Sequence, residues 1–448
     1  MKTGKKFHVL IFLFLTTVSF SSTGISQWIS TNGPIYGWSI RSVTVMSKVS
    51  GGMNLYAGSH GGVYLSTNNG TTWDSASTTL ANTFAECLAV ALDGSGEDLF
   101  TGTDGNGIYR STDYGASWMS VSTGLASSYV NALAVVPYMP GGTNIFAGTW
   151  AGISLSTDNG ASWTSVDTGL TNLDVLSISV FDTMLFVGTY GGGIFCSTNN
   201  GASWDSINVG LISRYVYALA TLPNGKGGAD LFAGTVGGGV FLSTDNGGSW
   251  SPRNNGFPKD SYDTSMYSSV NTFCAWGRNL FVGTDGNKVY LSTDEGDSWR
   301  DVNAGLGDSY VKALAISPDG VGDSSIFAAT SNGVWRRPLS EMLTAVSISS
   351  NNLPREFIMK QSFPNPFNPT ATIQYDLPIQ SRVTLKVYNL LGQVVATLTN
   401  GIEEPGYRSA TWNADNFSSG IYFYRLEATS TSNSSKSFTE VKKMLLLK

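Results

Sequence analysis

Few side chains in this sequence could support acid–base chemistry, and two aspartates are the main candidates. Asp104 and Asp285 occupy equivalent loops of two repeated segments, so we expect them on one face of the molecule. A glycosidase needs two carboxyl groups that flank the scissile bond. Each aspartate is also followed by glycine, and Asp-Gly is a common turn sequence. We therefore predict no catalytic residues, with a glycoside hydrolase as the alternative.

Histidine and cysteine usage argues against several other kinds of site. His60 is the one histidine after residue 26, which leaves little basis for a histidine triad or a multi-histidine zinc site. Cys87, Cys196 and Cys274 lie in apolar segments of different repeats, which predicts buried free thiols. The glycine runs at 191–193 and 237–239 lie inside predicted hairpins, so no phosphate-binding loop is expected. We predict no metal and no cofactor.

A further carboxylate recurs within an eight-residue motif. In the copy Ser156-Thr-Asp158-Asn-Gly160-Ala-Ser-Trp163, Asp158 can accept backbone N–H bonds and Gly160 can adopt a positive φ. Trp163 can then place its apolar ring beneath the turn. Two copies have asparagine instead of aspartate, which favours a structural acceptor over a catalytic acid or a calcium ligand. The predicted structural positions are Asn68, Asp113, Asp158, Asn199, Asp245 and Asp294, with Trp73, Trp118, Trp163, Trp204, Trp250 and Trp299.

The spacing of the motifs identifies the elements that position them. Successive motif tryptophans are 45, 45, 41, 46 and 49 residues apart, a period typical of repeat architectures. Each repeat contains short runs of β-branched and aromatic residues between glycine-rich turns, which predicts four short strands. The composition, with 41% hydrophobic and 13% charged residues, is typical of a folded protein.

The two ends of the repeat region complete one another. Seven predicted hairpins begin at Leu55, Leu99, Ile145, Leu185, Leu231, Leu280 and Ile326. The last hairpin has no motif and no fourth strand after it in the sequence. Trp28, at the other end, belongs to a fourth strand that is not preceded by the first three strands of a repeat. The Trp28 strand would therefore complete the last repeat and remove open sheet edges. We predict an all-β fold with a seven-bladed β-propeller over residues 27–341.

The motif Ser-x-Asp-x-Gly-x-x-Trp resembles the Asp-box, or BNR repeat, of sialidase-like β-propellers. Five close copies and a looser one, Ser66–Trp73, carry the resemblance. It implies motifs at the blade periphery, away from any active site. Sialidases of this family use three arginines, a tyrosine nucleophile with a glutamate partner, and an acidic proton donor. Here few of the arginines are expected to converge on one mouth by blade position. The propeller's glutamates lie in strand, turn or linker contexts: Glu86, Glu97, Glu295 and Glu341.

Two related groups bear on the expected activity. Xyloglucan-cleaving Asp-box enzymes carry two propellers, whereas this sequence predicts one. Photosystem assembly factors have seven similar blades and no catalytic activity. The resemblance therefore implies a propeller fold and is compatible with a protein that is not an enzyme.

The N-terminal residues predict export. Three lysines precede the apolar run Phe7–Val18, and small residues near Ser26 suit a cleavage site, so residues 1–26 are predicted to be a secretory signal peptide. The run is shorter than the ~20 apolar residues that a membrane-spanning helix needs. Residues 27–341 contain 13 Lys and Arg against 25 Asp and Glu, a net charge of −12. Nucleic acid is therefore not an expected partner.

The repeat ends at residue 341 and a different segment follows. Residues 342–357 are predicted to be a linker, and residues 358–448 contain six or seven alternating strand-like runs, which predicts a small Ig-like β-sandwich. Four stretches of this segment resemble the type A C-terminal sorting domain of the type IX secretion system: PNPFNPT (Pro364–Thr370), VYNLLGQVV (Val387–Val395), SSGIYFYRL (Ser418–Leu426) and KKMLLLK (Lys442–Lys448). The resemblance implies that residues 358–448 engage the outer-membrane secretion machinery of a Gram-negative, Bacteroidetes-like bacterium. It also implies that the protein reaches the cell surface or the medium.

A propeller has two loop-bearing faces, which we name by what each carries. The hairpin face carries the turns between second and third strands and the loops between blades, and the motif face carries the motif turns. The predicted binding residues lie on the hairpin face: His60, Asp104, Trp150, Tyr190 and Asp285 in turns, with Trp38 and Arg214 in blade-to-blade loops. Tyr129, Tyr215 and Tyr310 precede strands and could line the same face or cap the core.

Aromatic rings among small polar residues suit a sugar ring or a peptide. We therefore predict a secreted or surface-exposed, monomeric, non-enzymatic propeller that binds a glycan or a surface protein, or that acts as a scaffold.

Overall fold

The computed structural model describes residues 27–31, 33, 39–48, 52–76, 79–92, 96–138, 142–224, 229–318, 324–343, 354, 356–363, 365, 367–403, 405–431 and 436–447. The predicted signal peptide and most of the predicted linker lie outside these residues. No helix in the described part of the chain is long and apolar enough to span a membrane.

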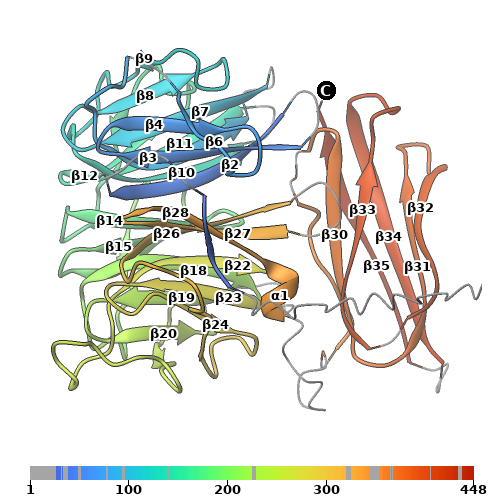
Figure 1. Ribbon diagram of the computed structural model, residues 1–448. Helices are drawn as coiled ribbons and strands as arrows, with labels where there is room; N and C mark the ends of the chain where they lie inside the picture. Colours follow the sequence, from blue (N-terminus) through green and yellow to red (C-terminus); the bar gives the residue numbers. More distant parts are fainter. Residues whose placement is uncertain are drawn as a thin grey trace, which may run out of the picture.

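Seven four-stranded antiparallel sheets, counted over the described residues, form the blades of a propeller (Figure 1). Blade 1 consists of β2 (Ile40–Ser47), β3 (Met53–Ser59), β4 (Gly62–Ser66) and β5 (Asp74–Ser75). Blade 2 consists of β6 (Ala85–Leu92), β7 (Glu97–Thr103), β8 (Ile108–Ser111) and β9 (Met119–Ser120). Blade 3 consists of β10 (Val130–Tyr138), β11 (Gly142–Thr149), β12 (Gly152–Ser156) and β13 (Thr164–Ser165). Blade 4 consists of β14 (Val175–Phe181), β15 (Met184–Thr189), β16 (Gly193–Ser197) and β17 (Asp205–Ser206). Blade 5 consists of β18 (Val216–Pro223), β19 (Ala229–Thr235), β20 (Gly239–Ser243) and β21 (Ser251–Pro252).

The last two blades close the ring. Blade 6 consists of β22 (Val270–Trp276), β23 (Asn279–Thr284), β24 (Val289–Ser292) and β25 (Arg300–Asp301). Blade 7 consists of β26 (Val311–Pro318), β27 (Ser324–Thr330), β28 (Gly333–Pro338) and, from the other end of the propeller sequence, β1 (Ile29–Ser30). Ile29 pairs with Arg336 and Ser30 with Trp335. The predicted closure through the Trp28 strand is therefore confirmed.

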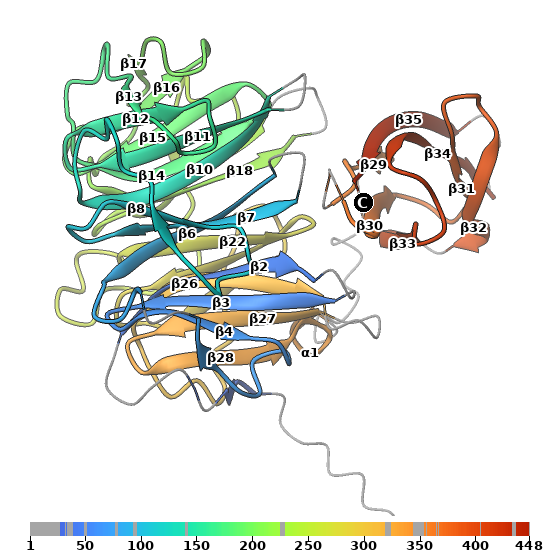
Figure 2. The same ribbon diagram turned by 90° about the horizontal axis from the view of Figure 1, so that it is seen from above.

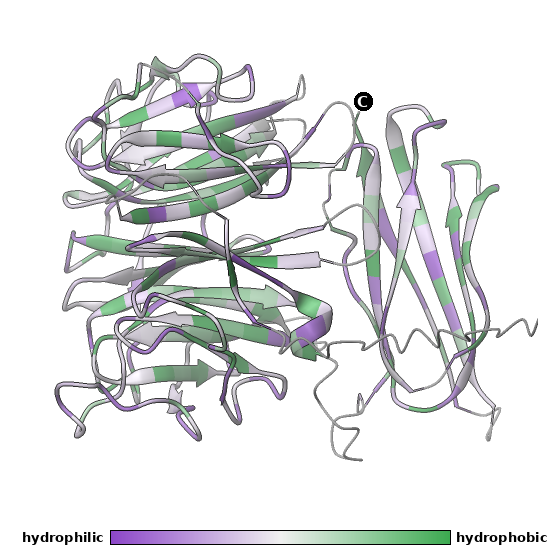
Figure 3. Cartoon of the chain, viewed as in Figure 1, coloured by the Kyte–Doolittle hydropathy of each residue, from purple (hydrophilic) through white to green (hydrophobic). Residues whose placement is uncertain are grey.

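Packing between blades explains the apolar second strands. The first strands contact one another in a closed ring, from β2 through β6, β10, β14, β18, β22 and β26 back to β2. Each second strand is covered on both faces by neighbouring blades, so it is buried almost throughout, as in β3 and β7. Fully buried aromatic rings occupy the equivalent position of these strands: Tyr56, Phe100, Phe146, Phe186, Phe232, Phe281 and Phe327. Figure 3 shows hydrophobic residues along the strands of the molecule.

The motif turn is a hydrogen-bonded structural unit. Asp158 Oδ1 accepts bonds from the Ser156 hydroxyl at 2.8 Å and the Ser162 backbone N–H at 2.9 Å. Gly160 has φ 86°, as predicted, and a Cβ there would lie 2.9 Å from Cε1 of Phe100 in the preceding blade. Glycine is therefore required both by the backbone conformation and by the close approach of a neighbouring ring.

The motif tryptophans join successive blades. The indole N–H of Trp163 donates to the carbonyl of Val121 in the preceding blade at 2.7 Å, and Trp163 itself is buried. Trp204, Trp250 and Trp299 make the equivalent bond. Trp73 instead donates to the Thr31 hydroxyl, and Trp118 to Gly115 within its own turn. Most motif tryptophans therefore bond across a blade interface as well as filling space.

The short helix α1 (Leu339–Leu343) ends the propeller. Met342 is buried in the core of blade 7, so the folded propeller continues slightly beyond the predicted boundary at residue 341.

The C-terminal domain is a small β-sandwich. One sheet contains β29 (Ile358–Met359), β30 (Thr370–Leu377) and β33 (Gly406–Asn413). The other contains β31 (Ser381–Tyr388), β32 (Val394–Glu403), β34 (Gly420–Ser430) and β35 (Ser437–Leu446). Phe367 pairs with Leu446, so the segment around PNPFNPT lies against the C-terminal strand. Figures 1 and 2 both show this domain beside one face of the propeller.

Candidate functional site

Each first strand contains a β-bulge at its hairpin-face end. In β10, for example, Val130 pairs with Thr149 and Ala132 with Gly148, which leaves Asn131 as the extra residue. Bulges re-aim side chains and are frequent beside binding and active sites. The seven bulge residues found in the described strands are Arg41, Glu86, Asn131, Leu176, Tyr217, Asn271 and Lys312.

One sector of this ring of bulge residues is charged. Arg41 Nε lies 3.7 Å from Glu86 Oε1, and Arg41 Nη2 lies 3.4 Å from Nε2 of His60. Burial raises the pKa of Glu86; Arg41 and Lys312 oppose that rise, and Asp104 adds to it. Burial and the charge of Arg41 lower the pKa of His60, whereas Asp104 raises it. His60 and Asp104, both predicted site residues, are therefore brought into one electrostatic cluster with Arg41 and Glu86.

Further polar contacts extend around the ring. Lys312 Nζ lies 3.3 Å from Asp285 Oδ1, so this predicted carboxylate has a cationic partner. The Asn131 side-chain amide donates to the carbonyl of Val175 at 2.9 Å and lies 3.5 Å from Asp174 Oδ1. Burial raises the pKa of Asp174, and the Asn131 contact lowers it in part.

Exposed aromatic side chains lie in the loops of the hairpin face. Tyr129 and Trp150 stack with ring centroids 4.2 Å apart and planes 8° apart. Tyr190 and Tyr215 meet edge to face at 4.8 Å. Trp150 is 54% exposed and Tyr190 50% exposed. Because Tyr129 and Tyr215 are also exposed, they contribute to this surface and do not cap the core.

The structure therefore places the described predicted binding residues on one face but on different blades. His60, Asp104, Trp150, Tyr190 and Asp285 begin the turns after second strands, and Arg214 is exposed in the loop before β18. Their carboxylates do not form a matched pair, since Asp285 contacts Lys312 and Asp104 acts on Glu86 and His60. Trp38 lies outside the described residues.

Sequence reasoning missed several residues of this face. Glu86 was assigned to an ordinary strand context, although its bulge places it beside Arg41. A polar residue or a tyrosine directly after the first apolar residue of the inner strand was the available signal, with Leu176 as the exception. Phe84, which meets the His60 ring edge to face at 4.4 Å, and the highly exposed Tyr262 were also missed.

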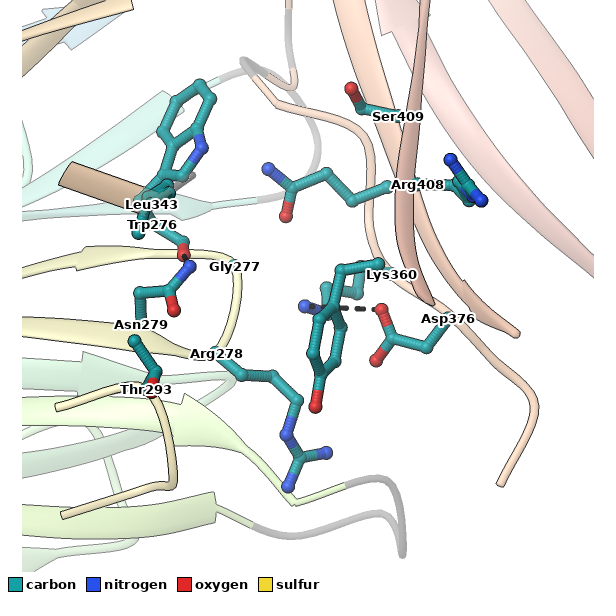
Figure 4. Close-up of a pocket in the computed structure, with 12 residues that line it drawn as sticks. Trp276, Gly277, Arg278, Asn279, Thr293, Leu343, Lys360, Asp376, Arg408 and Ser409 are labelled. Atoms are coloured by element: carbon teal, nitrogen blue, oxygen red, sulfur yellow. Dashed lines mark hydrogen bonds and ion pairs between the residues drawn. The ribbon is translucent and has the colours of Figure 1, made fainter. Parts of the chain in front are cut away.

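The motif face holds a cavity where the C-terminal domain meets blade 6 (Figure 4). Its volume is about 340 Å³, and its walls include Trp276 at the end of β22 and Arg278 in the β22–β23 turn. Lys360 Nζ lies 3.8 Å from the buried carboxylate of Asp376 in the C-terminal domain. Burial raises the pKa of Asp376, and Lys360 and Arg278 oppose that rise. The C-terminal domain therefore occupies the motif face and leaves the hairpin face uncovered.

Over the described residues, no group of three or more His, Cys, Asp or Glu side chains is placed to hold a metal ion. Cys87, Cys196 and Cys274 are free, with Cys196 buried and the other two half-buried. Burial raises the pKa of the Cys87 thiol to about 12 and that of Cys196 to about 11, so neither is a ready thiolate.

Comparison with known proteins identifies the C-terminal domain. Residues 361–440 match the family described as the secretion system C-terminal sorting domain. This is the sorting domain of the type IX secretion system, and the protein is exported to the surface of a Bacteroidetes-type bacterium or secreted. No curated protein sequence matches the chain.

Solved structures that resemble the chain include a GH74 xyloglucanase from Xanthomonas campestris, at 17% identity and TM-score 0.52, with 78% of this chain and 59% of that chain covered. YCF48 from Cyanidioschyzon merolae has 16% identity and TM-score 0.50, with 70% and 98% covered. PorZ, a surface component of the type-IX secretion system of Porphyromonas gingivalis, has 16% identity and TM-score 0.48, with 88% and 58% covered.

At these identities the xyloglucanase and YCF48 support the propeller fold alone. The chain spans less than two thirds of the PorZ and xyloglucanase chains.

Proposed function

We propose that this protein is a non-enzymatic surface or secreted β-propeller that binds a glycan or a protein through its hairpin face. The observation that carries the proposal is the pair of exposed aromatic contacts, Tyr129–Trp150 and Tyr190–Tyr215, on the face opposite the sorting domain. Solvent-exposed aromatic clusters are uncommon unless they mark an interaction site. A ligand could occupy this face before or after export, because the sorting domain contacts the other one.

We assign the motif turns to the Asp-box class and give them a structural role. Their aspartates bond within the turn and most of their tryptophans bond across a blade interface, as Asp158 and Trp163 do. These contacts leave the motif residues with no part in the proposed binding.

The charge pairing of the hairpin face favours binding over acid–base catalysis. Asp285 lies beside Lys312, and Glu86 lies beside Arg41, so each carboxylate is compensated locally. The alternative is a glycoside hydrolase in which Glu86, with its raised pKa, donates the proton. If the wild-type protein releases sugar from neutral polysaccharides and the Glu86→Gln variant does not, the hydrolase is supported. We propose instead that wild type and variant both release no sugar.

The binding proposal is tested with the purified full chain. Trp150→Ala combined with Tyr190→Ala should abolish recovery of ligand in a pull-down and on a glycan array. Thr157→Ala, at an exposed position of the motif face, is the matched control and should retain recovery. Loss of binding in the control but not in the double variant would place the site on the motif face. Sedimentation of the same samples tests the expected monomer.

A further inference from the structure

The exposed aromatic residues of the hairpin face follow one another along consecutive blades. Phe84 precedes the first strand of blade 2, Tyr129 and Trp150 belong to blade 3, Tyr190 to blade 4, and Tyr215 precedes the first strand of blade 5. Their side chains are between 38% and 54% exposed. We call these five residues the aromatic arc. A ligand that contacts the whole arc must extend across four blades.

The arc offers stacking surfaces at three places. Phe84 lies beside the His60 ring, Tyr129 and Trp150 form a parallel stack, and Tyr190 meets Tyr215 edge to face. Each cluster exposes at least one aromatic ring, and the flat apolar face of such a ring can cover the C–H face of a sugar.

Short polar side chains lie between these clusters. The Asn131 amide contacts Asp174, and the Asn172 amide donates to the carbonyl of Tyr190 at 3.0 Å. Asp104 is exposed next to Tyr129 in the backbone pairing. Carboxylate and amide groups beside aromatic faces are suited to sugar hydroxyls, since both accept O–H hydrogen bonds.

The charge of the arc favours a neutral ligand over an anionic one. Glu86, Asp104 and Asp174 lie along it, against Arg41 and Arg214. Residues 27–341 have a net charge of −12, so the propeller as a whole repels polyanions.

We infer that the aromatic arc binds a neutral polysaccharide lengthwise, with one stacking position at each of its three clusters. The inference rests on the proposed function and specifies its ligand. Each stack contributes a modest part of the affinity, so a short oligosaccharide binds weakly and a longer one gains from each cluster that it reaches. Exposed aliphatic residues in the same loops, Leu173 and Ile212, would suit a protein instead, and the experiment separates the two.

The experiment starts with the full chain in affinity electrophoresis against xyloglucan, mixed-linkage glucan, mannan and starch. A ladder from disaccharide to octasaccharide of the retained polymer is then titrated calorimetrically. Affinity should rise along the ladder. Trp150→Ala and Tyr190→Ala should each weaken octasaccharide binding about tenfold, equivalent to about 1.4 kcal/mol. The double variant should lose about a hundredfold.

Tyr262→Ala is the matched control, because Tyr262 is an exposed aromatic residue of the same face outside the arc. It should bind the octasaccharide as wild type does. Equal affinity for short and long oligosaccharides, or equal losses in Tyr262→Ala and Trp150→Ala, would overturn the inference. A third outcome is that no polysaccharide is retained, but a purified surface protein binds only when Trp150 and Tyr190 are intact. That outcome would overturn the polysaccharide inference and leave the proposed binding function standing. Absence of any ligand dependent on these residues would reject both.

Discussion

At the scale of single residues, the motif shows how a repeated carboxylate can be structural. Asp158 Oδ2 accepts a bond from the Ser162 hydroxyl at 2.5 Å. In the Asn199 copy the geometry is kept and the direction reverses: the amide donates to the Ser203 hydroxyl at 2.8 Å. An asparagine therefore replaces the aspartate without loss of a bond, which a catalytic acid would not tolerate.

We predict that Asp158→Ala destabilises the propeller and Asp158→Asn does not. Alanine removes the acceptor for Ser156 and Ser162, at a cost of about 1 kcal/mol, because the turn is exposed to water. Urea unfolding of the full chain measures the difference, with Thr157→Ala as a control at an exposed neighbouring position. Equal destabilisation by Asn and Ala would show that charge, and not hydrogen-bond geometry, matters at this position.

We also predict an acid-dependent loss of stability from Asp158 and Asp245. The hydroxyl of Ser162 is the largest cause of the lowered pKa of Asp158, and the pKa of Asp245 is lowered mainly by the Ser243 hydroxyl. A carboxylate whose folded pKa lies below its unfolded value stabilises the fold above the unfolded pKa, about 3.9, and loses that stabilisation as the pH falls through the folded pKa.

Unfolding free energy should therefore decrease below about pH 4, the range in which unfolded aspartates take up protons. The unfolding free energy of Asp158→Asn should decrease less steeply with falling pH, because one of the carboxylates whose protonation is coupled to unfolding has been removed. Denaturant titrations at neutral and acidic pH measure both slopes. Identical slopes for the variant and wild type would contradict the assignment.

At the scale of elements, a two-residue strand closes the ring. The indole N–H of Trp28, beside β1, donates to the carbonyl of Val302 at 2.7 Å, and its backbone N–H donates to Ala304 at 2.8 Å. The Trp28 side chain is 2% exposed, in the core between blades 6 and 7. The closing strand is therefore held more by this anchor than by its own length.

We predict that Trp28→Ala lowers the stability of the propeller by about 3–5 kcal/mol, because a buried ring and its hydrogen bond are lost. Ile29→Ala, on the same strand but largely exposed, should change stability by no more than about 0.5 kcal/mol. Thermal unfolding of the two variants gives the comparison. An unchanged melting temperature for Trp28→Ala would contradict closure through this strand.

At the scale of the whole molecule, the sorting domain and the aromatic arc lie on opposite faces of the propeller. The sorting domain meets the β22–β23 turn of blade 6 near Arg278, whereas the aromatic arc lies at the other ends of the strands. The docked sorting domain therefore does not obstruct the proposed binding face.

We predict that deletion of residues 358–448 abolishes surface delivery and leaves the propeller folded in the periplasm, because the sorting domain is the part that engages the secretion machinery. Cell fractionation and surface proteolysis measure the location. The purified truncated propeller should retain the ligand recovery of the full chain. Surface display of the truncated chain would refute the role of the domain, and lost ligand recovery would place part of the binding site on it.

Much of the architecture followed from the sequence. Turn residues and the motif tryptophan recur at fixed offsets, and this local pattern determined the strands of each blade, the number of blades and the role of Trp28 in closure. The C-terminal β-sandwich followed in the same way from the alternation of apolar and polar residues along its strands. The face that carries His60, Asp104, Trp150 and Tyr190 also followed, because strand order alone decides at which end a turn emerges.

Other features were decided only by tertiary structure. The bulge that places Glu86 beside Arg41 is a property of pairing between strands, so the polar residue that marks each position in the sequence does not reveal its partner. The Tyr129–Trp150 stack joins two loops that the sequence separates by a whole strand pair. The docking of the sorting domain on the motif face depends on contacts between segments about a hundred residues apart, near Arg278 and Asp376. Local pattern determines how a chain folds into repeats, whereas the direction of each side chain depends on neighbours that only the closed ring brings together.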